Sequence, residues 1–160
     1  MKILVPVDGS SASLDAVQHA LELLREGLRG TLVLANVQEP ASLWELLRMH
    51  DAEAIEAISR SAGEHSLQDA AAMCSAAGAE FVQAFASGEP AATLHDIAEE
   101  HGCDLVIMGA RGKGETPGTR LGSVAHALLH DAALPVTIVR HTVPEAEAEA
   151  ETETEPDTDA

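Results

Sequence analysis

Apolar residues in this chain follow two periods, which alternate along the sequence. Short continuous runs of Val, Ile, Leu and Ala predict strands that are buried on both faces. These runs lie at residues 2–7, 31–37, 79–86, 103–109 and 134–139. Between them the apolar positions recur every three or four residues, as at Leu14, Val17, Leu21 and Leu24, which predicts helices. The alternation predicts an α/β fold: a doubly wound parallel five-stranded sheet with helices on both faces, in a strand order that periodicity does not give.

Glycine and proline mark the ends of the predicted helices. Gly27 follows the first helix, and Gly102 follows a helix whose first turn holds Pro90. The segment 41–77 is helical in composition, and Gly63 predicts a break in the middle of it. The long stretch between the second and third strands is therefore expected to hold two shorter helices.

The acids of this chain are unevenly spread. Its 160 residues carry 27 Asp and Glu against nine Lys and Arg, a formal net charge of −18. Eight acids and no base lie between Glu145 and Asp159, which leaves 27 − 8 = 19 acids in the rest of the chain. A segment of such composition cannot bury apolar surface. We expect one domain over residues 1–142 and a disordered acidic tail over residues 143–160, which either solubilises the protein or binds a protein partner.

Charge and hydropathy also limit the expected partners. Nineteen acids against nine bases make the predicted domain itself acidic, which argues against nucleic acid or an anionic membrane as a partner. No apolar run approaches the roughly 20 residues of a membrane span, and Asp8 interrupts the start too early for a signal peptide. Cys74 and Cys103 have no metal-like spacing and are interpreted as small buried apolar residues. We expect a cytoplasmic protein.

The stretch "GARGKGETPGTRLGS" (109–123) lies between the fourth predicted strand and a helix predicted over residues 121–130. It contains three of the nine bases, namely Arg111, Lys113 and Arg120. Glycine has no Cβ to block a close approach and can adopt positive φ, which suits a loop whose amides surround a phosphate. The glycines in question are Gly109, Gly112, Gly114 and Gly118. The composition favours a polyphosphate site, and the alternative is a solvated surface loop.

The helix after this loop begins at "GS", Gly122 and Ser123. The first amides of a helix and its positive dipole end favour an anion, and Ser123 adds a hydroxyl that could also cap the helix. In a doubly wound sheet, ligands bind at the carboxyl ends of the strands where the winding reverses. Asp8 follows the first strand, and its carboxylate can accept hydrogen bonds from ribose or serve as a helix N-terminal acid. Ser10 and Ser11 are expected to cap the first helix.

The spacing Gly109-x2-Gly112-x9-Gly122-Ser123, preceded by "VIMG" and followed by "VAHALLHDAALPVTIVR", resembles the signature of the ATP-binding branch of the universal stress protein family. The first strand and turn, "ILVPVDGSSAS", are similar to that family as well. The resemblance covers residues 2 to about 140. It implies strand order 3-2-1-4-5, a homodimer formed through the last strand, and ATP lying across the ends of strands one and four.

The resemblance also implies roles for particular residues. By this resemblance the first-strand residues Pro6, Val7 and Asp8 contact adenine and ribose, and Val37 lines the adenine pocket. The remaining positions hold the ribose and phosphates, and they are Met108, Gly109, Arg111, Gly112, Gly122, Ser123 and Val124. The intervening "KGETPGTRL" departs from the pattern, because Glu115 beside a triphosphate would have to face solvent or a magnesium ion.

The sequence favours a regulatory protein that binds ATP, with or without Mg²⁺, and relays energy or stress state. An alternative is a dimeric interaction or scaffold protein with a vestigial pocket, which would act through the segment around Trp44 and the acidic tail. Slow ATP hydrolysis is a third possibility, although the sequence positions no residue to activate water. His126 and His130 stand four residues apart on a predicted helix and are interpreted as facing solvent, so no catalytic residue or metal ligand is predicted.

Overall fold

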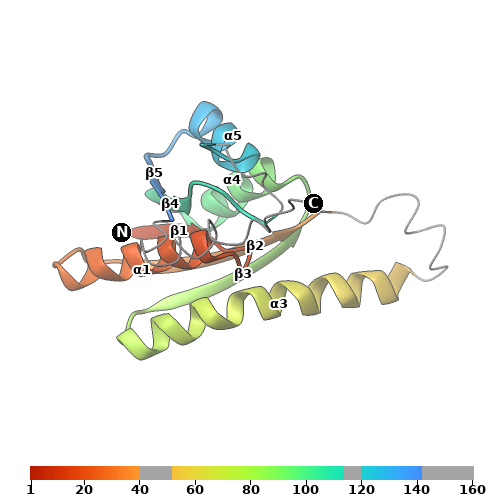
Figure 1. Cartoon of the computed structure of the whole chain (residues 1–160), viewed down its shortest axis with the longest axis horizontal. Helices are drawn as coiled ribbons and strands as arrows, with labels where there is room; N and C mark the ends of the chain where they lie inside the picture. Colours follow the sequence, from red (N-terminus) through yellow and green to blue (C-terminus); the bar gives the residue numbers. More distant parts are fainter. Residues whose placement is uncertain (40–51, 114–119, 142–160) are drawn as a thin grey trace, which may run out of the picture.

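The computed structural model describes residues 1–39, 52–113 and 120–141, and for residues 52–59 it describes the backbone alone. Strands and helices alternate along these ranges (Figure 1). In chain order they are β1 (Lys2–Pro6), α1 (Ser11–Arg25), β2 (Thr31–Gln38), α3 (Ala52–Ala77), β3 (Phe81–Ser87), α4 (Pro90–His101), β4 (Leu105–Gly109), α5 (Ser123–Asp131) and β5 (Val136–Val139). Each strand expected from the apolar runs is present, with its ends shifted by up to two residues.

The five strands form one parallel sheet in the order β3-β2-β1-β4-β5. This confirms the doubly wound α/β fold and the strand order implied by the resemblance. Helices α1 and α3 cover one face of the sheet, and α4 and α5 cover the other (Figure 1). The winding reverses between β1 and β4, which are neighbours in the sheet and far apart in the sequence.

Successive residues of each central strand supply two separate hydrophobic cores. Ile3 and Val5 of β1 pack with Leu67 and Cys74 of α3, together with α1. Leu4, between them, points to the opposite face and packs against α4 and α5. Strand side chains alternate between faces, so a strand covered on both sides must be apolar at every position. This is why the buried strands appear in the sequence as continuous apolar runs.

The predicted break at Gly63 is wrong, because α3 runs without interruption through that position. Gly63 is buried beneath the sheet, where an added Cβ would lie 2.1 Å from Cε2 of Phe85 and 2.7 Å from Oδ1 of Asn36. Glycine therefore allows α3 to pack closely against β2 and β3 instead of ending the helix. Residues 41–51 of the expected helical segment 41–77, including Trp44, lie outside the described residues.

The remaining local expectations concern caps and cysteines. Ser10 caps α1, and its hydroxyl accepts a hydrogen bond from the amide of Ser13 at 3.2 Å. Gly102 ends α4 at a φ of 63°, a left-handed conformation that favours glycine. Cys74 and Cys103 are both free and buried, as predicted. None of the helices within the described ranges is both long enough and apolar enough to cross a membrane.

Candidate functional site

A pocket of about 590 Å³ lies where the carboxyl ends of β1, β2 and β4 meet. The residues predicted as site residues from the sequence all line this pocket, although they come from four separate segments. They are Pro6, Val7, Asp8, Val37, Met108, Gly109, Arg111, Gly112, Gly122, Ser123 and Val124. Gly114, Glu115 and Gly118, also considered from the sequence, lie outside the described residues. The switch in winding direction thus produces the cleft expected at that point of a doubly wound sheet.

Asp8 joins the turn after β1 to the loop after β4. Its Oδ1 accepts hydrogen bonds from the amide and the hydroxyl of Ser10 at 2.9 and 2.6 Å. Its Oδ2 accepts a hydrogen bond from the amide of Lys113 at 2.7 Å. Burial alone would raise the pKa of the Asp8 carboxyl, but these hydrogen bonds to the charged form outweigh burial and hold the pKa below its usual value. Asp8 is therefore a carboxylate that fixes the position of the loop.

Gly112 lies directly against this carboxylate. A Cβ at Gly112 would lie 2.5 Å from Oδ2 of Asp8, closer than a methyl group can approach. Gly109 is crowded from the other side, because its Cβ would lie 2.7 Å from the backbone oxygen of Ala12 in α1. Neither glycine is among the described glycines with positive φ. The expectation that these two glycines adopt positive φ is therefore wrong. The loop requires glycine at both positions because neither has room for a side chain.

Helix α5 begins at the edge of the same pocket. Gly122 is its N-cap residue and Ser123 its first helical residue, so Ser123 does not cap the helix as one interpretation of the sequence allowed. The amide of Gly122 donates to the carbonyl of Ala110 at 2.8 Å, which holds the start of α5 beside the end of β4. The positive end of the helix dipole therefore faces the pocket that Asp8 and Gly112 border.

Two bases of the loop also line the pocket, Arg111 and Lys113, and both are exposed. A Cβ at Gly9 would lie 2.9 Å from Nζ of Lys113 and 3.3 Å from Oγ of Ser66. The Lys113 side chain thus reaches back across the turn after β1 towards α3. The pocket consequently combines backbone amides, a helix N-terminus and two cations, a set of groups that favours an anion.

Apart from Val37 of β2, sequence analysis did not identify the pocket residues from β2, α3 and α4. Asn36 is buried and its side-chain amide donates to the carbonyl of Val7 at 2.7 Å, while Gln38 donates to Oδ1 of Asn36 at 2.8 Å. Asn36 could have been found, because it is a polar residue inside the apolar run "TLVLANV". His65 and Leu94 also line the pocket, but nothing in their local sequence distinguishes them from their neighbours.

The described residues contain no group of three His, Cys, Asp or Glu side chains that could hold a metal ion. His126 and His130 are both exposed on α5, as the sequence analysis expected. The only carboxylates that line the pocket among the described residues are those of Asp8 and Glu39.

Comparison with known proteins gives the family. The model of the universal stress protein family matches residues 1–140. The chain belongs to the universal stress protein family. It is 30% identical over 145 residues to the universal stress protein YxiE of Bacillus subtilis, an alignment that covers 87% of this chain and 98% of that protein.

Solved structures of the family have the same fold. The universal stress protein UspA from Lactobacillus plantarum aligns with a TM-score of 0.74 at 22% identity, over 88% of this chain and 97% of that one. A universal stress protein solved in complex with cAMP aligns with a TM-score of 0.60 at 27% identity, over 88% of this chain and 96% of that one. The parallel sheet in the order 3-2-1-4-5 is thus shared with these family members.

Proposed function

We propose that this protein binds an adenine nucleotide, ATP in particular, in the pocket at the ends of β1, β2 and β4, and relays energy or stress state through the bound loop. The polyphosphate would lie between the Gly109–Lys113 loop and the start of α5. The ribose would lie near Asp8, and the adenine would lie against Val37. A magnesium ion could accompany the phosphates through solvent and phosphate oxygens.

The observation that carries this proposal is the convergence of the whole predicted residue set on one pocket. These residues come from four segments between Pro6 and Val124, yet the fold brings them to the same edge of the sheet. Gly112 fits there only without a side chain, since Asp8 occupies the neighbouring space. The family member solved with cAMP supports an adenine nucleotide as the ligand class.

The electrostatics favour a polyanion at the loop. The chain has a formal net charge of −18, so long-range attraction does not draw an anion to it. Attraction must come from local groups, namely the amides of the loop, the α5 N-terminus, Arg111 and Lys113. These groups lie together at the mouth of the pocket, where the charged end of a nucleotide can remain partly in water.

A thermal melt of the full chain with and without millimolar Mg-ATP tests the proposal. A ligand that binds only the folded state stabilises it by about 2.7 kcal/mol at 100 times its dissociation constant. For a chain of this size we expect a rise of roughly 5–10 °C in the melting temperature. GTP is the control for the base, and inorganic triphosphate is the control for the phosphates. No shift with any of the three would contradict the proposal.

We further propose that the protein is a homodimer through β5 and functions in the cytoplasm. β5 is an outer strand that pairs with β4 alone among the described strands, and its four residues are only partly buried. An unpaired strand edge offers a row of backbone hydrogen-bonding groups to a second copy. Size-exclusion chromatography with light scattering measures the mass directly, and a monomer at about 100 μM would contradict the dimer.

A further inference from the structure

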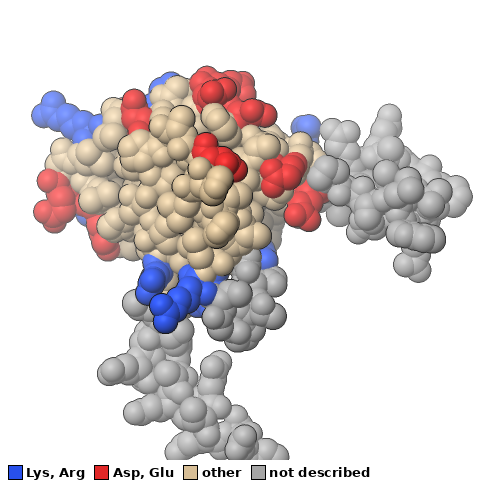
Figure 2. Space-filling model, turned by 90° about the horizontal axis from the view of Figure 1, so that it is seen from above, with Lys and Arg blue, Asp and Glu red and all other residues tan. Residues whose placement is uncertain are grey.

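Four bases lie at the carboxyl end of β4 and β5, and we call them the basic rim: Arg111, Lys113, Arg120 and Arg140. Within residues 1–39, 52–113 and 120–141, both ion pairs involve histidine, and no carboxylate lies within 4.0 Å of a charged group of the rim. Figure 2 shows a group of Lys and Arg side chains at the lower edge of the molecule, separate from other Lys and Arg at the upper left and from Asp and Glu along the upper and side edges. Lys2, Arg25, Arg29 and Arg60 also lack an ion pair among the described residues, so the rim is distinguished by the grouping of four bases in one place.

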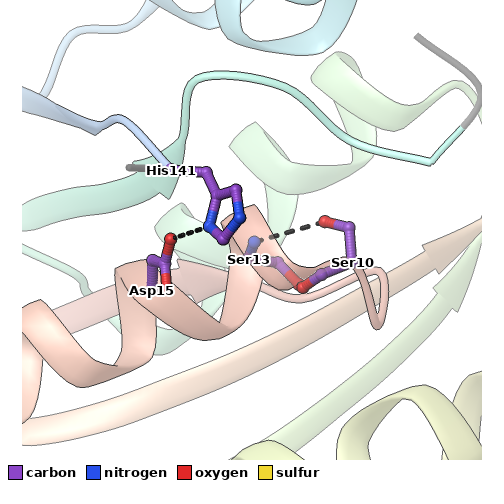
Figure 3. A network of polar contacts seen from close by, with 4 residues as sticks. All are labelled: Ser10, Ser13, Asp15 and His141. Atoms are coloured by element: carbon purple, nitrogen blue, oxygen red, sulfur yellow. Dashed lines mark hydrogen bonds and ion pairs between the residues drawn. The ribbon is translucent and has the colours of Figure 1, made fainter. Parts of the chain in front are cut away.

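The last described residues, Arg140 and His141, lie beside this rim. Val139 of β5 is in register with Gly109 of β4, and its carbonyl accepts a hydrogen bond from the amide of Ala110 at 2.7 Å. Arg140 therefore lies next to the start of the loop that contains Arg111. The following residue, His141, is held to α1, because its Nδ1 lies 2.5 Å from Oδ2 of Asp15 (Figure 3).

Figure 3 also shows how near this contact is to the candidate site. Asp15 stands on the first turns of α1, close to Ser13, whose amide donates to Ser10. Ser10 in turn donates to Asp8 in the pocket. The contact with Asp15 therefore holds His141, the residue before residue 142, beside α1 at the side of the pocket that carries the bases.

The sequence that continues from this point is complementary in charge to the rim. Residues 145–159 contain eight acids and no base, and Glu145 stands four residues after His141. An extended chain spans about 3.3–3.6 Å per residue, so the first acid can reach about 14 Å from His141. Attachment to the same chain gives such a segment an effective concentration of about a millimolar.

We propose that the basic rim is a docking surface for an acidic peptide, occupied by residues 145–159 of the same chain, which compete there with the nucleotide polyphosphate. The carboxylates of the segment offer the same charge and the same acceptor oxygens as phosphates. The competition rests on the proposed function, whereas the docking does not. Nucleotide affinity would then depend on ionic strength and on any event that removes the acidic segment from the rim.

The docking is tested on the nucleotide-free full chain by comparison with a variant in which the six Glu of residues 145–155 are changed to Gln. Amide NMR resonances of Arg111–Lys113 and Arg140 should differ between the two proteins at low salt. They should converge at about 0.5 M NaCl, where screening is strong. Arg140→Gln, which removes a rim base that does not line the pocket, should reduce the difference. Arg25→Gln at the opposite end of the sheet is the matched control and should not reduce it.

Identical rim resonances at low salt would overturn the docking. If the differences in rim resonances disappear when the protein is diluted tenfold, docking within one chain is also overturned, and a second copy of the chain is the occupant. The competition is measured by ATP titration: the six-Gln variant should bind about fivefold more tightly at low salt and equally at high salt. Equal affinities at low salt would overturn the competition. If the rim resonances differ between the two proteins but neither protein binds ATP, the result supports the docking and contradicts the proposed function alone.

Discussion

At the scale of single residues, Asp8 and Gly112 form the centre of the candidate site. The Asp8 carboxylate accepts hydrogen bonds from both the turn after β1 and the loop after β4. Gly112 lies so close to that carboxylate that a side chain would displace it. Because the two residues are 104 positions apart in the sequence, their contact depends on the pairing of β1 with β4.

Asp8→Asn should destabilise the protein in a pH-dependent way. The amide keeps the shape but loses the charge, and a hydrogen bond to a charged group is worth about 1.5–3 kcal/mol. Because the pKa of Asp8 is lowered in the folded state, its contribution is present above the pKa of the unfolded chain and is lost as pH falls through the lower folded value. Urea unfolding from pH 7 down to about pH 2.5 should show a stability difference that shrinks in acid. A difference that stays constant would contradict this role.

Gly112→Val should remove nucleotide binding at a modest cost in stability. The new side chain must push the Asp8 carboxylate and the loop apart. Overpacking of this kind lowers the free energy of unfolding by about 1–3 kcal/mol. Gly112 does not have positive φ, so backbone strain adds little. The expected result is a folded protein whose melting temperature no longer rises with ATP. Ala72→Val on the exposed side of α3 is the control, and an unchanged ATP shift in the Gly112 variant would argue against binding at this loop.

The sequence identified these site residues partly through chemistry and partly through the family resemblance. Glycines and bases in one stretch indicated the loop, and a carboxylate at a strand end indicated Asp8. The hydrogen bond from Lys113 to Asp8 could not be predicted, because it requires two distant segments to meet. His65 was missed as a pocket residue for the same reason, since only the packing of α3 on β2 brings it to the pocket.

At the scale of elements, Gly63 shows where a local rule and the tertiary structure disagree. In an isolated helix glycine costs about 1 kcal/mol relative to alanine, which made a break plausible from sequence. In the fold, the absent side chain makes room for Phe85 and Asn36. Local sequence predicts well that a segment is helical, but it carries no information on which face of the helix must approach a sheet closely.

Gly63→Ala should therefore destabilise the protein despite its higher helix propensity. A Cβ at 2.1 Å from the Phe85 ring forces α3 away from the sheet, and the net loss should be about 1–3 kcal/mol. Phe85→Leu in the same chain should recover part of the loss by making room. Ala72→Gly, an exposed position of the same helix, reports the propensity term alone. Denaturant unfolding measures all four proteins, and a Gly63→Ala protein more stable than wild type would contradict the packing argument.

The edge of β5 that does not pair with β4 is a second feature at the scale of elements. The carbonyls of Pro135 and Val139 accept hydrogen bonds from the amides of Val106 and Ala110. Because the backbone groups of successive strand residues alternate in direction, those of Val136 point to the open edge. Val136→Pro removes one donor from that edge without removing a bond to β4. We expect the dissociation constant of the proposed dimer to rise by about tenfold or more in sedimentation equilibrium. Val136→Thr is the control, and an unaffected dimer would place the interface elsewhere.

At the scale of the whole molecule, the sequence predicted the five strands and their alternation with helices but not how these elements are arranged. Continuous apolar runs identify buried strands such as β2, yet they are the same whichever strand lies in the centre of the sheet. The order 3-2-1-4-5 came from the family signature, and with it the meeting of β1 and β4 that creates the pocket. The charge distribution along the chain could be predicted from the sequence, whereas the position of Arg140 beside the loop that contains Arg111 required the fold.

A crystal structure of the full chain grown with ATP tests the central claim most directly. The account predicts phosphate oxygens within hydrogen-bond distance of the amides of Arg111–Lys113 and of the first turn of α5. It also predicts adenine against Val37 and a ribose near Asp8. Phosphates bound away from this loop, or an empty pocket in crystals grown at millimolar ATP, would contradict it.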